Sequence, residues 1–157
     1  MLDDTQMTVL ELAARGYSCA QIVMLMGLRL LGRENPDLTR AMSGLAMGAC
    51  IGSVCGALSG GLCLIAVHTA KGLEDERPFP LSRSLMGALV KWFTFEELGG
   101  GIKPECAEIF KAAGKSFDPS SSIPVSSCAD LVARTWIKAV SILSENGLDP
   151  VLGRAEA

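Results

Sequence analysis

No Asp, Glu, Lys or Arg occurs between Arg40 and Lys71, a stretch long enough to cross a lipid bilayer. Within it, glycine recurs at every fourth position, at residues 44, 48, 52, 56 and 60. Such small-xxx-small spacing is typical of transmembrane helix interfaces. The stretch therefore allows three interpretations: a membrane helix, a packed core segment, or a loop. The loop would expose backbone groups together with the sulfurs of Cys50, Cys55 and Cys63.

Helix geometry argues against the membrane interpretation. Residues four apart rotate by about 40° around a helix axis, so five glycines do not form one seam. In water, each mid-helix glycine also costs about 1 kcal/mol relative to alanine. The stretch has no Trp or Tyr to mark a membrane interface, and it contains His68. We therefore expect no membrane span, and we predict a glycine-rich loop over residues 44–54 followed by a buried helix.

The rest of the chain has the periodicity of helices. The pattern predicts helices over residues 5–15, 18–30, 38–42 and 55–72, from Leu81 to the glycines at 99–101, from Pro104 to Gly114, and from Cys128 to about Leu143. The second of these is apolar almost all round, which places it in the core. No alternating strand pattern appears. We predict an all-α, single-domain bundle of five to seven helices over residues 1–157, with an irregular tail from about residue 148.

Charge and termini limit the classes of partner. The net charge is -3, so no basic face is available to neutralise nucleic-acid phosphates, and we expect no nucleic-acid partner. The N-terminus is acidic and amphipathic and lacks the basic start of a secretory signal, which predicts a cytoplasmic protein. In that reducing compartment the six cysteines are metal ligands, redox thiols or core residues rather than permanent disulfides.

Four cysteines occupy matching positions, each in the first turn of a predicted helix: Cys19, Cys55, Cys106 and Cys128. Free backbone N–H groups and the helix dipole favour negative charge there, so we expect these thiols to have lowered pKa values. Glycines near Cys55 (Gly52, Gly56 and Gly60) would let backbone donors approach a sulfur or a bound cofactor. Cys63 is predicted to be a core residue. Cys50 either pairs transiently with Cys55 or simply packs.

The segment Cys55-Gly56-Ala57-Leu58-Ser59-Gly60 resembles the central motif of the C_GCAxxG_C_C family of redox-active proteins. Cys19 in GYSCAQIV, Cys106 in FEELGGGIKPECAEIF and Cys128 in SSCADLVARTW resemble its other three cysteines. The resemblance covers about residues 8–145, and it implies redox activity in a helical, mostly prokaryotic protein without defining a reaction. Cys50 departs from the plain glycine-rich run of the family.

A related sequence region in a multihaem cytochrome is associated with an iron–sulfur centre. The first hypothesis is therefore an iron–sulfur cluster, [2Fe–2S] for preference, held by Cys19, Cys55, Cys106 and Cys128 and used for electron transfer with an unidentified redox partner. A second is a metal-free dithiol/disulfide protein with Cys55 as the nucleophile, and a third is a structural zinc site made of the same four cysteines.

Other sequence features exclude some chemistries. No C-x-x-C-H haem attachment sequence is present, so covalent haem is not expected. His68 is the only histidine and is predicted to be a core or surface residue, which leaves no Cys–His pair for hydrolysis. Apolar helix faces in excess of one small core would allow a homodimer. Whether the protein is an enzyme stays open from the sequence.

Overall fold

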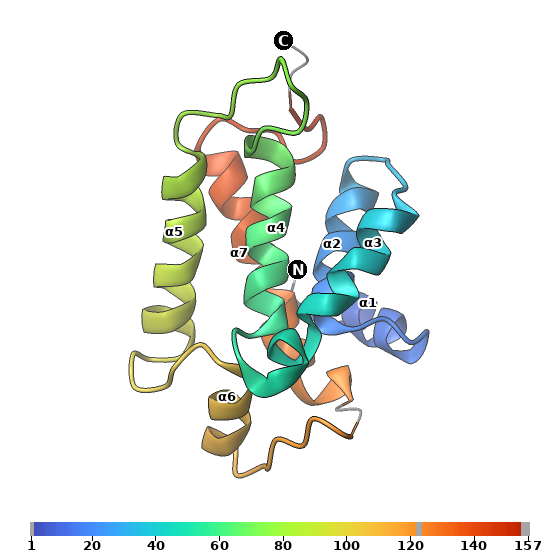
Figure 1. Cartoon of the computed structure of the whole chain (residues 1–157), viewed down its shortest axis with the longest axis vertical. Coiled ribbons are helices and arrows are strands. Elements are labelled where there is room, and N and C mark those ends of the chain that lie inside the picture. The colour runs from blue at the N-terminus through green and yellow to red at the C-terminus, as the bar shows by residue number, and fades with distance from the viewer. Residues whose placement is uncertain (1, 122–123, 155–157) are drawn as a thin grey trace.

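The computed structural model describes residues 2–121 and 124–154. Within these residues the chain forms seven α-helices and no β-strand, so the all-α prediction is confirmed (Figure 1). The helices are α1 (Leu2–Ala14), α2 (Cys19–Leu30), α3 (Pro36–Met42), α4 (Gly56–Thr69), α5 (Ser82–Trp92), α6 (Cys106–Ala112) and α7 (Ala129–Glu145). After α7 the described residues form turns.

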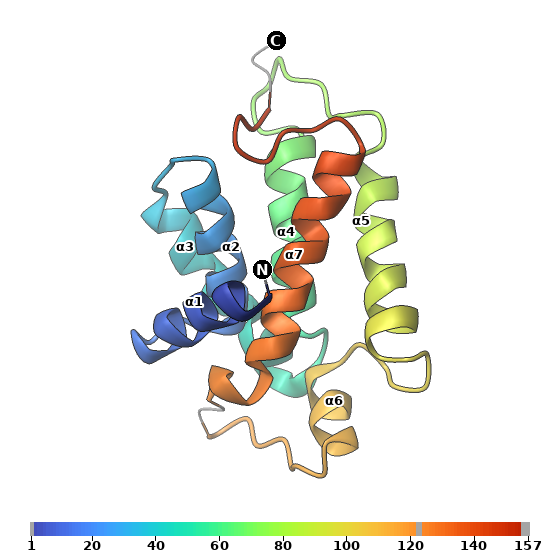
Figure 2. The same cartoon turned by 180° about the vertical axis from the view of Figure 1, so that it is seen from behind.

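Helix α4 is the centre of the bundle, as the apolar sequence after the glycine-rich segment predicts. It packs against α2, α5 and α7, and these neighbours surround it in both views (Figures 1 and 2). Its Leu58, Leu64 and Ile65 are almost completely buried. The same core includes Val9, Leu12, Ile22, Val23, Leu89, Phe93, Val132 and Leu143. One continuous apolar core therefore joins the first helix to the last.

Glycines allow α4 to lie very close to its neighbours. A Cβ atom on Gly60 would lie 3.1 Å from the Cα atom of Ala20 in α2. A Cβ atom on Gly61 would lie 2.7 Å from a side-chain carbon of Leu89 in α5, and one on Gly27 in α2 would overlap Leu64. The packing that these contacts permit compensates for the low helix propensity of glycine within α4.

The segment between α3 and α4 is not α-helical, as its glycine content predicts. Residues Met47–Cys50, here called the left-handed turn, all have positive φ angles, of 54°, 61°, 56° and 63°. The backbone N–H of Ser53 donates to the carbonyl of Gly48 at 2.9 Å, and a Cβ atom on Gly48 would lie 2.2 Å from the Ser53 carbonyl oxygen. Only glycine therefore fits at position 48. The other three residues each adopt a conformation that costs about 1–2 kcal/mol for an L-amino acid.

Two backbone hydrogen bonds fix the end of this segment to the start of α6. The N–H of Cys55 donates to the Pro104 carbonyl at 3.0 Å, and the N–H of Cys106 donates to the Ser53 carbonyl at 2.8 Å. Between them, Val54 and Glu105 form an isolated antiparallel bridge. The prediction that Pro104 begins the helix is wrong, because residues 104 and 105 are used for this extended pairing and α6 begins at Cys106.

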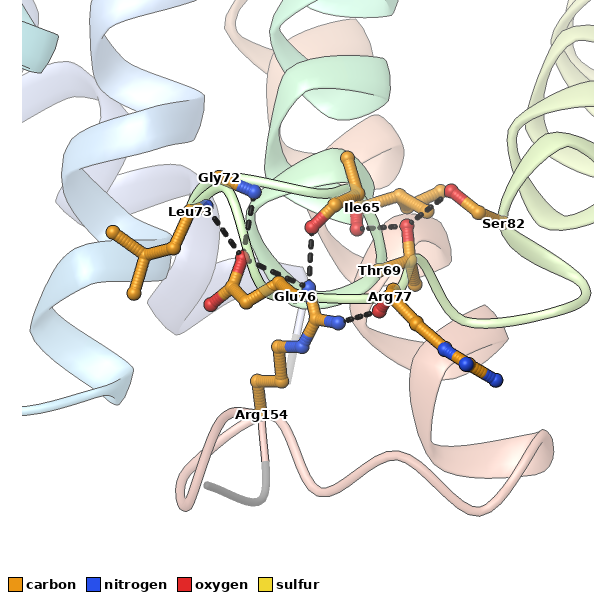
Figure 3. Close-up of polar contacts among 9 residues, drawn as sticks. Ile65, Thr69, Gly72, Leu73, Glu76, Arg77, Ser82 and Arg154 are labelled. Atoms are coloured by element: carbon orange, nitrogen blue, oxygen red, sulfur yellow. Dashed lines mark hydrogen bonds and ion pairs between the residues drawn. The ribbon is translucent and has the colours of Figure 1, made fainter. Parts of the chain in front are cut away.

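At the opposite end of the bundle, the C-terminal segment is attached to the link after α4 (Figure 3). Arg154 donates to the carbonyls of Ala70 and Arg77 and lies 3.5 Å from a carboxylate oxygen of Glu76. That oxygen also accepts the backbone N–H groups of Gly72 and Leu73 at 2.6 and 2.9 Å. These contacts fix the C-terminal segment to the charged link, at the end of the bundle where α4 ends.

No single helix in the described part of the chain is both long and apolar enough to cross a membrane, consistent with the expectation from the sequence. The helices α1 and α2 reach the length and apolar composition of a membrane span only when they are taken together, and the pair is bent by 120°.

The close contact between α2 and α4 is testable by substitution. Gly60→Val places two methyl groups against the backbone of α2 and is expected to lower the free energy of unfolding by about 1–3 kcal/mol. Gly87→Val is the control, because Gly87 is on an exposed face of α5 with no atom within 4 Å of its Cβ position. We expect the control to change stability by less than about 0.5 kcal/mol in urea denaturation. Equal effects of the two changes would contradict the packing described.

Candidate functional site

The starts of several helices lie at one end of the bundle. Helices α2, α4 and α7 run in the same direction, and their N-terminal ends face the end that carries α6 (Figures 1 and 2). The segment Ser43–Cys55 lies at this end as well, below the start of α4. The arrangement therefore brings together sequence positions that are more than a hundred residues apart.

All four predicted cysteines lie at these helix starts, in two different positions. Cys19 and Cys106 are the first residues of α2 and α6. Cys55 and Cys128 are the residues immediately before α4 and α7, so the prediction that every cysteine lies within a first helical turn is wrong for these two. At α2 the local cause is a capping box, in which the backbone N–H of Ser18 donates to the side-chain oxygen of Gln21 at 3.0 Å.

The four cysteines and Cys50 line one cavity of about 520 Å³, here called the cysteine cavity. Its other walls are formed by Ala13, Gly16, Tyr17, Ser18, Ser43, Ala46, Met47, Gly56, Ala57, Ile109, Phe110, Pro124, Val125 and Leu131. Among the described residues that form these walls there is no Asp, Glu, His, Lys or Arg. The chemistry available on the walls is therefore mainly that of sulfur.

Cys19 is central among the four thiols. It lies close enough to Cys55, Cys106 and Cys128 for negative charges on the sulfurs to repel one another. A Cβ atom on Gly56 would lie 2.4 Å from the Cys19 sulfur, so glycine at the start of α4 leaves the space that this sulfur occupies. Cys128 is held by its own hydrogen bond, donating from Sγ to the Val125 carbonyl at 3.4 Å.

Burial reverses the expected direction of the thiol pKa values. It raises the pKa of Cys55 to about 12, with the neighbouring Cys19 contributing to the rise. Burial likewise raises the pKa of Cys128 to about 12 and that of Cys106 to about 11, in both cases with Cys19 adding to the effect. The pKa of Cys19 is raised by burial as well. The lowered pKa values expected from the helix starts are wrong for the free thiols, because loss of water outweighs the backbone donors.

At two of the sulfurs, backbone N–H groups act against the effect of burial on the pKa. Those of Met47 and Ala20 lower the pKa of Cys19, and those of Leu58 and Ala57 lower the pKa of Cys55, against the larger effect of burial. The Met47 donor belongs to the left-handed turn. Partial positive charge from the backbone is therefore already directed at the position where negative charge on sulfur would develop.

The three glycines predicted to bind a cofactor are in different places. Gly56 lines the cysteine cavity. Gly52 instead packs against Ala107 and Phe117, and Gly60 packs against α2, so neither is a wall residue. The structure therefore brings only Gly56 to the four sulfurs.

Three candidate residues remain, of which two lie in or near the core and one is exposed. Cys63 is half-buried on α4, where it packs against a second small cluster that contains Ala20, Met24, Leu28 and Met42. His68 is 2% exposed and its Nδ1 contacts the Leu64 carbonyl at 3.1 Å, as expected for a core residue. Cys50 is exposed and lines the cavity, a position that the sequence left open.

The sulfur donors suit a soft metal centre by their chemistry, although they are not arranged as a ready coordination sphere. Four thiols on one cavity are the ligand set of iron–sulfur clusters and of four-cysteine zinc sites. No group of three or more His, Cys, Asp or Glu side chains in the described residues has the spacing of a metal site in this conformation.

The fold and the cavity together define a helical protein whose distinguishing chemistry is a cluster of four buried or half-buried thiols. A family described as "Putative redox-active protein (C_GCAxxG_C_C)" matches residues 17–142, most of the chain. The chain belongs to this family of redox-active proteins. No curated protein and no solved structure matches it.

The raised pKa values predict how the thiols of the reduced, metal-free protein react with iodoacetamide. Only the thiolate reacts, so labelling of Cys55 and Cys128 at pH 7.5 should be slow and should accelerate about tenfold for each pH unit up to about 12. Cys50 is exposed and should be labelled first. Peptide mass mapping at several pH values measures both rates. Labelling of Cys55 as fast as Cys50 at pH 7.5 would contradict the burial described.

Proposed function

We propose that the protein is an electron carrier in which Cys19, Cys55, Cys106 and Cys128 hold an iron–sulfur cluster, [2Fe–2S] for preference. The observation that carries this proposal is the meeting of four thiols, from the starts of four helices, on one cavity without charged walls. A volume of about 520 Å³ exceeds what a single metal ion occupies. Such a cluster, when bound, supplies a redox couple for electron transfer.

The electrostatics of the cysteine cavity support a cationic occupant. Burial raises the pKa values of the four thiols, and the nearby Cys19 adds to the rise at Cys55, Cys106 and Cys128. Four thiolates without a counter-charge would therefore be strongly unfavourable there. Iron(II) or iron(III) would supply the missing positive charge. Sulfur ligands bind iron better than they bind hard cations. The backbone donors from Met47, Ala20, Ala57 and Leu58 would offset the residual negative charge on Cys19 and Cys55.

The chain itself supplies the surroundings that such a centre needs. Ile109, Phe110, Val125 and Leu131 form apolar walls, which limit access of water to the sulfurs. Burial of thiolate ligands and hydrogen bonds to them are both factors that set the reduction potential of a cluster. In this proposal, electrons pass between the cavity and an unidentified redox partner.

Burial weighs against the second hypothesis, in which Cys55 attacks a disulfide. Cys55 is 8% exposed and burial raises its pKa to about 12, so at neutral pH it is a protonated thiol that a substrate cannot easily reach. A ligand role makes better use of this position, because the metal itself displaces the proton. Zinc would use the same four donors, and metal analysis distinguishes it from iron.

Anaerobic purification from an iron-supplemented culture tests the proposal. The wild-type protein should be brown, with visible absorption and with iron and acid-labile sulfide in similar amounts. Cys55→Ser should lose most of the colour and iron. The matched control Cys63→Ser, on the helix that follows Cys55 but outside the cavity, should keep both.

A colourless wild-type protein without iron would overturn the proposal. Zinc that causes unfolding when it is chelated would identify the four-cysteine zinc site instead. Reversible loss of two thiols in a metal-free sample would identify a dithiol protein.

The space that Gly56 leaves for the Cys19 sulfur at the start of α4 provides an independent test. Gly56→Ala places a methyl group where the Cys19 sulfur lies, so Cys19 has to move and the bound iron should fall severalfold. Gly44→Ala is the control, because no atom lies within 4 Å of that Cβ position. Circular dichroism should show that both variants remain helical, and iron analysis reports the difference. Full iron content in Gly56→Ala would show that the position of Cys19 is not critical.

A further inference from the structure

The side chain of Gln21 joins the start of α2 to α3, two helices that pack side by side (Figures 1 and 2). Gln21 is half-buried and lies two residues after Cys19. Its Oε1 accepts the backbone N–H of Ser18 at 3.0 Å, and its Nε2 donates to the backbone carbonyl of Thr39 at 3.1 Å. One amide group therefore uses its acceptor at the start of α2 and its donor on α3.

The Thr39 carbonyl can accept from Gln21 because the hydrogen-bonding pattern changes where α3 ends. In a continuing α-helix the N–H of Ser43, four residues later, would donate to this carbonyl. Here that N–H donates to the carbonyl of Arg40 instead, and a short 3₁₀ turn follows. Thr39 is 9% exposed, so a donor from the protein has to replace water at its backbone. Gln21 supplies that donor.

The end of α3 leads directly into one wall of the cysteine cavity. Ser43 and Ala46 line this cavity, and so does Cys19 at the start of α2. The two walls meet at Gly56, where a Cβ atom would lie 2.4 Å from the Cys19 sulfur and 3.3 Å from the Cα atom of Ala46. Gln21 therefore connects the two elements that carry these walls, a few residues before the point where the walls meet.

The segment that contains this wall, Ser43–Cys55, is held near both of its ends. Two backbone bonds join its last residues to the start of α6. The bond from Gln21 to Thr39 fixes the helix from which the segment begins. Between these attachments is the left-handed turn, whose backbone angles have to be imposed by tertiary contacts. Loss of the attachment at α3 therefore acts on the wall beside Cys19.

We propose that Gln21 is a positioning residue of the cysteine cavity: its bond to Thr39 holds the wall after α3 against Cys19, and so sets the place of the Cys19 sulfur among the four thiols. The role needs an amide, because glutamine offers both an acceptor and a donor, whereas an ionised glutamate offers acceptors only. The inference rests on the proposed function only in that the positioned sulfur is a proposed iron ligand. The bond itself is present without metal.

Two substitutions separate the two bonds of Gln21. Gln21→Glu keeps an acceptor for the Ser18 N–H, as in the capping box, but removes the donor to Thr39. Gln21→Ala removes both bonds. The matched control is Asn146→Asp, the same exchange of an amide for a carboxylate at the other end of the bundle. There Asn146 follows α7 and donates to the carbonyl of Ile142 at 2.8 Å.

The first measurement uses the whole chain, reduced and free of metal, and follows iodoacetamide labelling of Cys19 at pH 7.5 by peptide mass mapping. Gln21→Glu and Gln21→Ala should both raise the labelling rate of Cys19 severalfold, because the wall after α3 is no longer held against it. Asn146→Asp should label at the wild-type rate. In urea denaturation Gln21→Glu should be closer to the wild type than Gln21→Ala, since it keeps the cap of α2. Gln21→Glu is therefore the deciding variant.

The second measurement is the iron content after anaerobic purification. Both Gln21 variants should hold severalfold less iron than the wild type, and Asn146→Asp should hold the wild-type amount. The split between a nearly unchanged urea midpoint and a large loss of iron in Gln21→Glu is the signature of positioning, because a residue that only stabilises the fold would change both together.

Wild-type labelling of Cys19 in Gln21→Glu would overturn the proposal, since helix capping would then be the whole role of Gln21. An equal rise in Asn146→Asp would also overturn it, because the effect would then be a general loss of stability. The outcome is separable from that of the iron experiment on the wild type. A wild-type protein without iron would refute the cluster, whereas labelling of Cys19 in the metal-free chain would still decide whether Gln21 positions this thiol.

Discussion

The contact between α2 and α4 is the interaction on which the site depends. Gly60 lets the two helix backbones approach, and Gly56 at the start of α4 leaves room for the Cys19 sulfur at the start of α2. The same interface therefore packs the core and sets two of the four thiols beside each other. The backbone bonds between Ser53–Cys55 and Pro104–Cys106 then bring a third helix start to that place. Core packing and the geometry of the cavity are consequences of one arrangement.

Much of the fold could be predicted because it follows from local patterns. Apolar spacing defined the helices, and the density of glycine between residues 44 and 54 correctly excluded α-helix there. Pro104 was misplaced because its role is set by a partner that is distant in sequence: its carbonyl accepts the N–H of Cys55, and no local propensity indicates that pairing. The left-handed conformation of Cys50 could not be predicted either, since the sequence around it also suits an ordinary loop.

The residues of the candidate site could be predicted from the sequence, but the direction in which their pKa values shift could not. A cysteine at each of four helix starts was apparent from the sequence, and the structure places all four on one cavity. The pKa values depend on how deeply the thiols are buried, which is a property of the assembled bundle. Helix starts alone favour thiolates, whereas burial among apolar walls favours thiols, and for Cys55 and Cys128 the second effect is larger.

The left-handed turn has a consequence for the order of events during biogenesis. Met47, Ala49 and Cys50 hold backbone angles that an isolated peptide of this sequence would rarely visit, so tertiary contacts have to impose them. The wall that this turn contributes is supported by packing of the segment Gly48–Gly52 against α6. A maturation step that recognises the completed cavity therefore requires a chain in which α6 is already in place.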